Sequence, residues 1–294
     1  MKINMATDRK TNILVTGANG QLGSELRVLA SNYLEFNFIF ADRDDFSFEN
    51  EKEILDFLNS NKPEIVINCA AYTAVDKAES EQELVNAINH LAVAIISKWT
   101  NQNKCKLIHI STDYVFDGNS EIPLLESDAT NPVNFYGESK LRGEEACFSN
   151  NPGSIIIRTS WVYCEFGNNF VKTMLRLMSE RTSINVVNDQ IGSPTYAADL
   201  AKAIMMIIVS NKWTAGIYNF SNEGQISWYE FALAIKNISK SNCEINGIPS
   251  SEFPTPANRP KYSLLDKTKI KNTFDIAVPT YDSSLAICLN KILC

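Results

Sequence analysis

The feature that most constrains the fold is a short apolar run that passes directly into a glycine-rich turn. Asn12 to Thr16 reads NILVT, which is typical of a buried parallel strand, and GANGQLG follows at 17–23. A helical periodicity extends from Gln21 to Asn32. Glycine permits the tight turn and lets the backbone approach a diphosphate, which the amides and dipole of a helix N-terminus favour. The order of strand, turn and helix predicts a dinucleotide-binding unit, with a plain tight turn as the alternative.

Strands and helices keep alternating through the first half of the chain. Further strands are predicted at Phe36 to Ala41, Glu64 to Asn68, Lys106 to Ile110 and Ser154 to Arg158. Helices are predicted near Glu49 to Asn59, Glu79 to Asn101 and Tyr136 to Phe148. Such alternation predicts an α/β fold of the Rossmann type, in which helices cover both faces of a doubly wound parallel sheet.

The alternation loosens after Asn168, which suggests a second region. Helix-like segments lie at Asn169 to Glu180, Ala197 to Ser210 and Ser227 to Ser239, and strand-like ones at Ile184 to Val187 and Gly216 to Phe220, before a proline-rich passage at 249–260. We expect residues 1–160 to form an NAD(P)-binding Rossmann domain. Residues 161–294 are expected to form mainly a smaller α/β substrate-binding region, partly interleaved with the core because no flexible linker is visible.

Composition narrows the function classes. With 294 residues and 45% apolar side chains, the chain can bury a substantial core. The formal charge of -7 and the scattered basic residues argue against a nucleic-acid binder. The sequence shows neither a membrane span nor a secretory signal in its first ten residues, so the expected location is cytoplasmic. Seven cysteines without a CxxC spacing are expected to be reduced packing residues.

Two segments after predicted strands are expected to contact the cofactor. Asp42 can accept hydrogen bonds from the adenosine ribose, whereas Arg43 can pair with a 2′-phosphate, so NADH and NADPH are both compatible. Ala70, Ala71 and Tyr72 follow the third strand, where small residues let a cofactor lie close to the backbone. A solvated loop pair and simple strand-end packing are the respective alternatives. The predicted cofactor contacts are Gly17, Asn19, Gly20, Gln21, Leu22, Gly23, Asp42, Arg43, Ala70, Ala71, Tyr72, Tyr136 and Lys140.

A hydroxyl and a tyrosine–lysine pair suggest a catalytic constellation. Thr112 lies at the end of the fourth strand, where ligands bind in a doubly wound sheet. Tyr136 and Lys140 are four residues apart and share one face of a helix. A nearby ammonium favours the phenolate and so lowers the pKa of a phenol from its ordinary value near ~10. The YxxxK spacing alone arises by chance; its position after the glycine turn and Thr112 makes it a catalytic prediction.

Several longer blocks resemble one family of the extended short-chain dehydrogenases/reductases. They are GANGQLG, AAYTAVDKAE (Ala70 to Glu79), STDYVFDG (Ser111 to Gly118), YGESKLRGE (Tyr136 to Glu144), RTSWVY (Arg158 to Tyr163), GNNFVKTML (Gly167 to Leu175), DQIGSPT (Asp189 to Thr195) and RPKYSLLD (Arg259 to Asp266). Together they resemble the dTDP-4-dehydrorhamnose reductases over nearly the whole chain. The resemblance implies reduction of the C4 keto group of dTDP-4-dehydro-β-L-rhamnose by NADPH or NADH, the last step of dTDP-L-rhamnose synthesis, which serves O-antigen and related glycans.

The resemblance also implies roles for individual residues. Tyr136 is expected to be the proton donor, Lys140 its activator and cofactor ligand, and Thr112 the hydroxyl that polarises the carbonyl. Trp161 resembles a substrate-side aromatic, and Arg259 is placed to meet the diphosphate, with packing and a surface salt bridge as the alternatives. The expected substrate contacts are Thr112, Asp113, Trp161, Asn169, Gln190 and Arg259, with Asp189 and Thr195 as further polar groups of the same blocks.

A metal and a dimer are less well supported by the sequence. In some members of the family, Mg²⁺ bridges a dimer through a glutamate on the first helix and carboxylates just after the Pro-Thr dipeptide. Glu25 is present, whereas Ala198 stands where a glutamate is expected. The chain is thus compatible with a monomer or a homodimer, and Glu25 is a weak candidate ligand.

Two other functions share parts of this pattern. The sugar-nucleotide 4,6-dehydratases and epimerases share the cofactor turn and YxxxK, but dehydratases typically carry Asp-Glu after the catalytic threonine, and here Tyr114 follows Asp113. The second alternative is a non-catalytic NADP-binding module related to the regulatory subunit of methionine adenosyltransferase. The sequence determines neither the preferred cofactor nor the exact keto sugar.

Overall fold

The computed structural model describes residues 9–210 and 212–294. The opening residues, in which no secretory signal was expected, therefore lie largely outside the described part. One six-stranded parallel sheet forms the centre, in the order β10-β5-β4-β3-β1-β2. Its strands are β1 (Thr11–Thr16), β2 (Phe36–Ala41), β3 (Ile65–Asn68), β4 (Lys106–Thr112), β5 (Ile155–Thr159) and β10 (Gly216–Phe220). The doubly wound α/β fold is confirmed.

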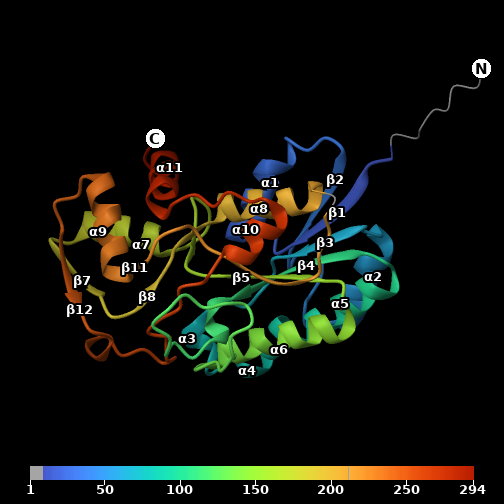
Figure 1. Ribbon diagram of the computed structural model, residues 1–294, viewed down its shortest axis with the longest axis horizontal. Helices are drawn as coiled ribbons and strands as arrows, with labels where there is room; N and C mark the ends of the chain where they lie inside the picture. The colour runs from blue at the N-terminus through green and yellow to red at the C-terminus, as the bar shows by residue number, and fades with distance from the viewer. Residues whose placement is uncertain (1–8, 211) are drawn as a thin grey trace, which may run out of the picture.

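Helices cover both faces of this sheet (Figure 1). One face packs against α1 (Gln21–Ala30), α8 (Ala197–Val209) and α10 (Thr268–Phe274). The other packs against α2 (Glu51–Asn61), α5 (Ala92–Gln102) and α6 (Phe135–Asn150). Successive residues of a strand alternate between these cores, as Ile13 and Val15 show on one face and Leu14 on the other. This explains why a strand such as NILVT is continuously apolar.

The long helix predicted from Glu79 to Asn101 is present from Gln82 to Gln102, with a π-helical turn inside it. It consists of α4 (Gln82–Asn86), the π-helical turn η1 (Ala87–Leu91) and α5, and the short helix α3 (Val75–Ala78) precedes it. The π turn carries Asn89, whose side chain is fully buried and binds the backbone of Tyr72. Periodicity did not reveal the π turn, because its residues are compatible with an ordinary α-helix.

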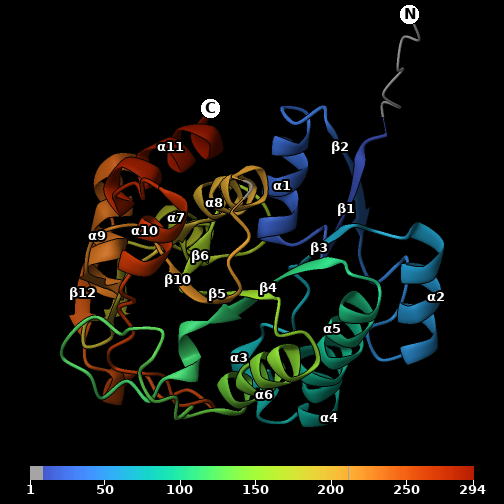
Figure 2. The ribbon, with the colours of Figure 1, turned by 45° about the vertical axis from the view of Figure 1, so that its right-hand side comes forward.

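The C-terminal region forms a second, smaller body beside the sheet (Figure 2). It contains α7 (Phe170–Glu180), α9 (Trp228–Ser239), α11 (Tyr281–Leu293) and the paired strands β7 (Ser183–Val187) and β12 (Glu244–Ile248). Shorter elements are η2 (Asp113–Val115), β6 (Val162–Tyr163), β8 (Ile191–Gly192), β9 (Thr195–Tyr196), β11 (Ile226–Ser227) and η3 (Ser250–Glu252). Because β10 and α8 belong to the central sheet and its core, a boundary at residue 160 separates the two bodies only in part.

No helix within 9–210 or 212–294 is long and apolar enough to cross a membrane. All seven cysteines are free, and five of them are buried.

Candidate functional site

The glycine turn lies at the point where the strand order reverses. β1 is flanked by β2 and β3, so the turn after β1 faces the crevice in which doubly wound sheets bind ligands. Gly17 has φ +65°, and an added Cβ would lie 2.7 Å from the nitrogen of Ala70. A Cβ on Gly23 would lie 2.4 Å from the Gly17 carbonyl oxygen. Only glycine allows this close packing of the turn against the segment after β3.

The first turn of α1 is open to an anion. No side chain caps the helix at Gly20, and no acidic residue lies in its first turn. The backbone amides and the helix dipole therefore favour a diphosphate at this end. Asn19 and Gly20 are exposed, whereas the Leu22 side chain is buried in the core and can offer only its amide. This cradle fits a dinucleotide cofactor.

Gln21 has a structural contact besides its predicted cofactor role. Its side-chain amide donates to the Val162 carbonyl oxygen over 3.2 Å, and its Oε1 accepts a hydrogen bond from Asn169 over 3.0 Å. Asn169 also caps α7 by accepting from Lys172 N and donates to the Cys164 carbonyl oxygen. In this structure Asn169, predicted to contact the substrate, joins the cofactor turn to the C-terminal region.

The other predicted cofactor residues surround the same crevice. Asp42, partly exposed after β2, accepts a hydrogen bond from the amide of Asp44, while Arg43 is exposed. Ala70, Ala71 and Tyr72 follow β3 beside the glycine turn. Asn89 fixes this segment by accepting from Tyr72 N and donating to Tyr72 O, and it also donates to the Ser139 hydroxyl on α6. Sequence analysis did not identify Asn89.

The start of α6 brings Tyr136 to the end of β4. Asn134 caps the helix by accepting from Gly137 N over 2.8 Å. An added Cβ on Gly137 would lie only 2.2 Å from the Tyr114 carbonyl oxygen, so glycine between Tyr136 and Lys140 lets α6 approach η2. The Tyr136 phenol lies close enough to the Thr112 side chain for that hydroxyl to influence its pKa. The structure thus brings together the two hydroxyls that the sequence predicted as partners.

The electrostatics of Tyr136 differ from the expectation. Loss of hydration raises the pKa of Tyr136 to about 12, although the nearby Thr112 hydroxyl opposes the shift. Burial also lowers the pKa of Lys140 to about 8. The expected lowering of the phenol pKa by the ammonium is therefore wrong for the protein alone. Lys140 Nζ instead donates to the Ile110 carbonyl oxygen over 2.7 Å and lies 3.5 Å from His109 Nε2.

Asp113 contributes an unpaired acid next to these groups. It is buried, its Oδ1 accepts from Thr112 over 3.1 Å, and its Oδ2 has no hydrogen-bond partner. Burial raises the pKa of Asp113 to about 7, even though hydrogen bonds from Ser263 and Thr112 favour the charged form. A buried carboxyl oxygen without a partner is suited to a ligand hydroxyl.

Trp161 follows β5 in a strained conformation. Its φ is +47°, which is unusual for a bulky residue, and its ring stacks on Trp228 at 3.7 Å between centroids. The other neighbour of the ring is Gly192, where an added Cβ would lie 3.0 Å from the indole. The stack and the close glycine hold the indole ring in one orientation.

The remaining predicted substrate residues have partners within the protein. The Arg259 guanidinium pairs with the Asp76 carboxylate at 2.8 Å and also donates to the Thr255 hydroxyl. The guanidinium points toward α3, and its hydrogen bonds are already made within the protein. To bind a diphosphate, Arg259 would have to give up its contact with Asp76 or Thr255. Gln190 and Asp189 both bind Ser250, and the Thr195 hydroxyl bonds with that of Thr159.

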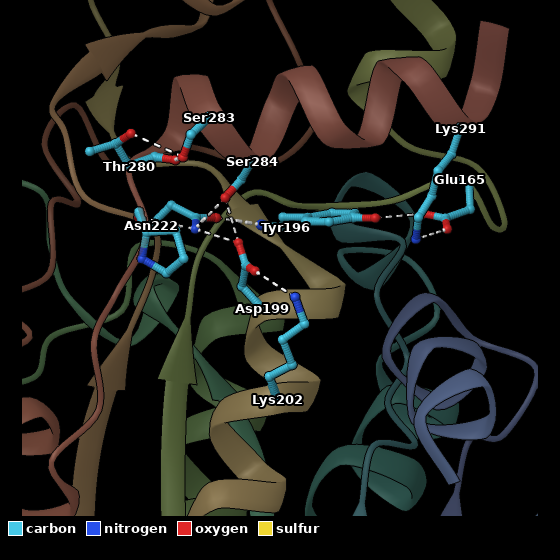
Figure 3. A network of polar contacts seen from close by, with 10 residues as sticks. Glu165, Tyr196, Asp199, Lys202, Asn222, Thr280, Ser283, Ser284 and Lys291 are labelled. Atoms are coloured by element: carbon cyan, nitrogen blue, oxygen red, sulfur yellow. Dashed lines mark hydrogen bonds and ion pairs between the residues drawn. The ribbon is translucent and has the colours of Figure 1, made fainter. Parts of the chain in front are cut away.

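The residues around Glu25 do not fit a magnesium ion. Within the described part of the chain, Glu25, Cys164 and Glu165 form the one group of potential ligands whose atoms lie within 4.8 Å of one another. Lys291 Nζ lies 2.5 Å from Glu165 Oε1, so an ammonium already supplies the positive charge (Figure 3). Mg²⁺ prefers an octahedron of oxygen ligands, and neither the thiol nor the ammonium suits it.

The later carboxylate is engaged elsewhere. Asp199, the acidic residue nearest to the Pro-Thr dipeptide, accepts hydrogen bonds from Asn222 and Ser284 and pairs with Lys202 (Figure 3). It does not join Glu25. Burial, followed by the neighbouring Glu165 carboxylate, raises the pKa of Glu25 well above its ordinary value, which favours a neutral carboxylic acid there.

Comparisons with known proteins identify the family of this chain. Residues 11–294 match the family profile described as the RmlD substrate binding domain. The chain is 41% identical to a dTDP-4-dehydrorhamnose reductase of Escherichia coli strain K12 and 39% identical to one of Salmonella typhimurium; each match covers 96% of this chain and 98% of the relative. A crystal structure of a dTDP-4-dehydrorhamnose reductase from Bacillus anthracis in complex with NADP superposes with a TM-score of 0.92 at 37% identity, covering 96% of this chain and all of that one.

Proposed function

The chain belongs to the dTDP-4-dehydrorhamnose reductase family, and we propose that it reduces the C4 keto group of dTDP-4-dehydro-β-L-rhamnose to give dTDP-β-L-rhamnose. The observation that carries the proposal is the proximity of the Tyr136 phenol to the Thr112 side chain at the end of β4, in a fold that also has the uncapped N-terminus of α1. A proton donor and a second hydroxyl at that end of a strand support a reductase function.

NADPH or NADH supplies the hydride for C4 of the sugar. The backbone of the turn at 17–23 and the small residues after β3 would hold the dinucleotide, with Asp42 and Arg43 at its adenosine end. Because a carboxylate and a guanidinium are adjacent there, we expect both cofactors to be used.

The side chains of this protein complete the reduction by handling charge and protons at O4. Tyr136 gives its proton to the oxygen as negative charge develops, and its raised pKa keeps the phenol protonated until then. Thr112 donates a hydrogen bond to the same oxygen, where such a donor stabilises the transition state most. Lys140 supplies positive charge nearby and binds the nicotinamide ribose. Asp113 Oδ2 would bind a sugar hydroxyl, and the flat face of Trp161 the apolar face of the ring.

The proposed location follows from the substrate, and the proposed assembly follows from the contacts of Glu165. A nucleotide sugar and a reduced cofactor are cytosolic metabolites, so we place the enzyme in the cytoplasm, in accord with its free cysteines. The ammonium beside Glu165 removes the argument for a metal-bridged dimer, so the proposed assembly is a monomer or a homodimer without a bridging metal.

The test is a spectrophotometric assay with purified protein. We expect loss of NADPH or NADH absorbance on addition of dTDP-4-dehydro-L-rhamnose, and Tyr136→Phe should lower kcat by about a hundredfold or more while cofactor binding is preserved. Tyr33→Phe, at a residue packed beside α1, is the matched control and should keep the native rate. Near-native turnover of Tyr136→Phe would remove the assigned proton donor. Absence of turnover with either cofactor would instead reject the reaction itself.

A further inference from the structure

A row of buried polar side chains runs across three neighbouring strands to the catalytic lysine. Thr16 Oγ1 donates to Asn68 Oδ1 over 2.6 Å, and the Asn68 amide nitrogen lies 3.1 Å from His109 Nδ1. The other ring nitrogen, Nε2, lies 3.5 Å from Lys140 Nζ. Strand register pairs Thr16 with Asn68 and Asn68 with His109, so the row follows directly from the alignment of β1, β3 and β4.

The imidazole in this row is uncharged. His109 has 0% exposure, and burial, followed by the charge of Lys140, holds the pKa of its ring well below the ordinary value. A neutral imidazole has one N–H donor and one bare nitrogen acceptor. Nε2 faces Lys140. Whether Nε2 carries the ring hydrogen or is free to accept one depends on the group that contacts Nδ1.

The amide of Asn68 makes that selection. When the Asn68 amide nitrogen donates to Nδ1, the ring hydrogen must be on Nε2. Two donors, Nε2–H and the Lys140 ammonium, then face each other, which is unfavourable. A half-turn of the amide puts Oδ1 against an Nδ1–H group, and Nε2 then accepts from Lys140. The second arrangement also lets the Asn68 nitrogen donate to Thr16 Oγ1. In this second arrangement a charged Lys140 can donate to His109 Nε2 as well as to the Ile110 carbonyl oxygen.

We propose that His109 is a positioning residue for Lys140, whose ammonium it holds charged and aligned by accepting a hydrogen bond at Nε2, with Asn68 and Thr16 fixing the ring. The inference rests on the proposed function, in which the charge of Lys140 assists Tyr136. Glu144 and Cys147 on α6 and Cys69 after β3 also face Lys140.

These other neighbours do not replace the imidazole. Glu144 forms a buried ion pair with Arg158, with 2.7 Å between Oε2 and Nη2. Burial raises the pKa values of the Cys69 and Cys147 thiols, which keeps both uncharged and poor acceptors. His109 Nε2 and the Ile110 carbonyl oxygen are therefore the two neutral acceptors that lie near Lys140 Nζ.

Paired substitutions separate positioning from packing. His109→Leu removes the acceptor, whereas His109→Gln keeps one; Ile108→Val, on the same strand but the opposite face, controls for a small loss of packing. We expect His109→Leu to lower kcat about tenfold and to shift the alkaline limb of its pH profile about one unit downward, because an unpaired ammonium loses its proton more easily. His109→Gln should keep the limb within about 0.3 units, and KM for NADPH should change less than about threefold in both. Equal losses in both variants with an unshifted limb would leave His109 a packing residue only.

Nuclear magnetic resonance of the wild-type protein provides a measurement that does not depend on activity. The chain has only two histidines, so ¹⁵N-labelled imidazole signals are readily assigned, with His90→Asn identifying the second. We expect the NADPH-bound protein to show a neutral His109 ring protonated at Nδ1 from about pH 6 to pH 9. An imidazolium signal, or a proton on Nε2 in the complex, would overturn the proposal even if the reductase assay succeeds.

Discussion

At Tyr136, burial and the Thr112 hydroxyl act on the phenol in opposite directions. Loss of hydration raises its pKa to about 12, while the Thr112 side chain favours the ionised form. A proton donor for an alkoxide does not need a low pKa in the resting enzyme, because the developing O4 anion is a strong base in the transition state. Thr112 can therefore stabilise negative charge on the Tyr136 phenol oxygen or on O4 of the sugar.

Thr112→Val tests this contribution with little change of shape. We expect kcat to fall by about a hundredfold, because one preorganised donor to the developing oxyanion is lost, while KM changes little. Thr112→Ser should recover much of the rate. Thr159→Val, at the paired position on β5 where the hydroxyl bonds with Thr195, is the control. If the valine and control variants have equal kcat in steady-state assays, Thr112 does not contact O4.

Among the elements, α11 has polar contacts with other parts of the fold near both of its ends. Ser284 near its start donates to Asp199 on α8, and Lys291 near its end pairs with Glu165, which also accepts from the Tyr196 hydroxyl over 3.2 Å (Figure 3). The Lys291 side chain also lies over the Tyr196 ring at 5.5 Å. These contacts anchor both ends of the helix.

The ion pair between Lys291 and Glu165 predicts how the stability of the protein responds to Mg²⁺ and to removal of the Lys291 ammonium. We expect EDTA and millimolar Mg²⁺ to leave the melting temperature of the wild type unchanged, because Lys291 already neutralises Glu165. Lys291→Met should lower the free energy of unfolding by about 0.5–1 kcal/mol, a modest value because the lysine is partly exposed. Lys52→Met, in an exposed pair on α2, is the control and should have a smaller effect. A saturable rise of the wild-type melting temperature with Mg²⁺ would show that the ion binds after all.

For the whole molecule, partly buried polar side chains connect the cofactor helix with the C-terminal region. Gln21 and Asn169 share a hydrogen bond, and the carboxyl groups of Glu25 and Glu165 lie within 4.8 Å of each other. Glu25 has 1% exposure and one carboxyl oxygen without a hydrogen-bond partner. Its raised pKa means that the folded protein binds a proton that the unfolded chain releases at neutral pH.

This proton makes global stability depend on pH. A carboxyl whose pKa is raised on folding stabilises the fold below its unfolded pKa, and that contribution is lost as the pH rises toward the folded value. Between about pH 5 and pH 8 we expect the free energy of unfolding to fall by about 1–2 kcal/mol through Glu25. Urea unfolding of Glu25→Gln should lack this decrease, whereas the exposed Glu121→Gln should retain it. Identical pH slopes for Glu25→Gln and the wild type would exclude Glu25 as the source.

Sequence by itself determined the alternation of strands and helices, the glycine turn after β1 and the position of Thr112 at the end of β4. Apolar periodicity and glycine spacing act locally, and the ends of parallel strands meet at one edge of a sheet whatever lies beyond them. The polar His109 within the apolar run KLIHI is a visible signal of a buried role, although the periodicity of the run predicts only a strand.

Only the tertiary structure decided which partners the charged and polar side chains have. Arg259 meets Asp76 from 183 residues away, Lys291 meets Glu165 from 126, and Lys140 meets His109 from 31. Within the π turn η1, Asn89 likewise meets the backbone of Tyr72 from 17 residues away. The energy of a buried charge or amide depends on hydration and on partners brought by other elements, and no local pattern of residues contains that information.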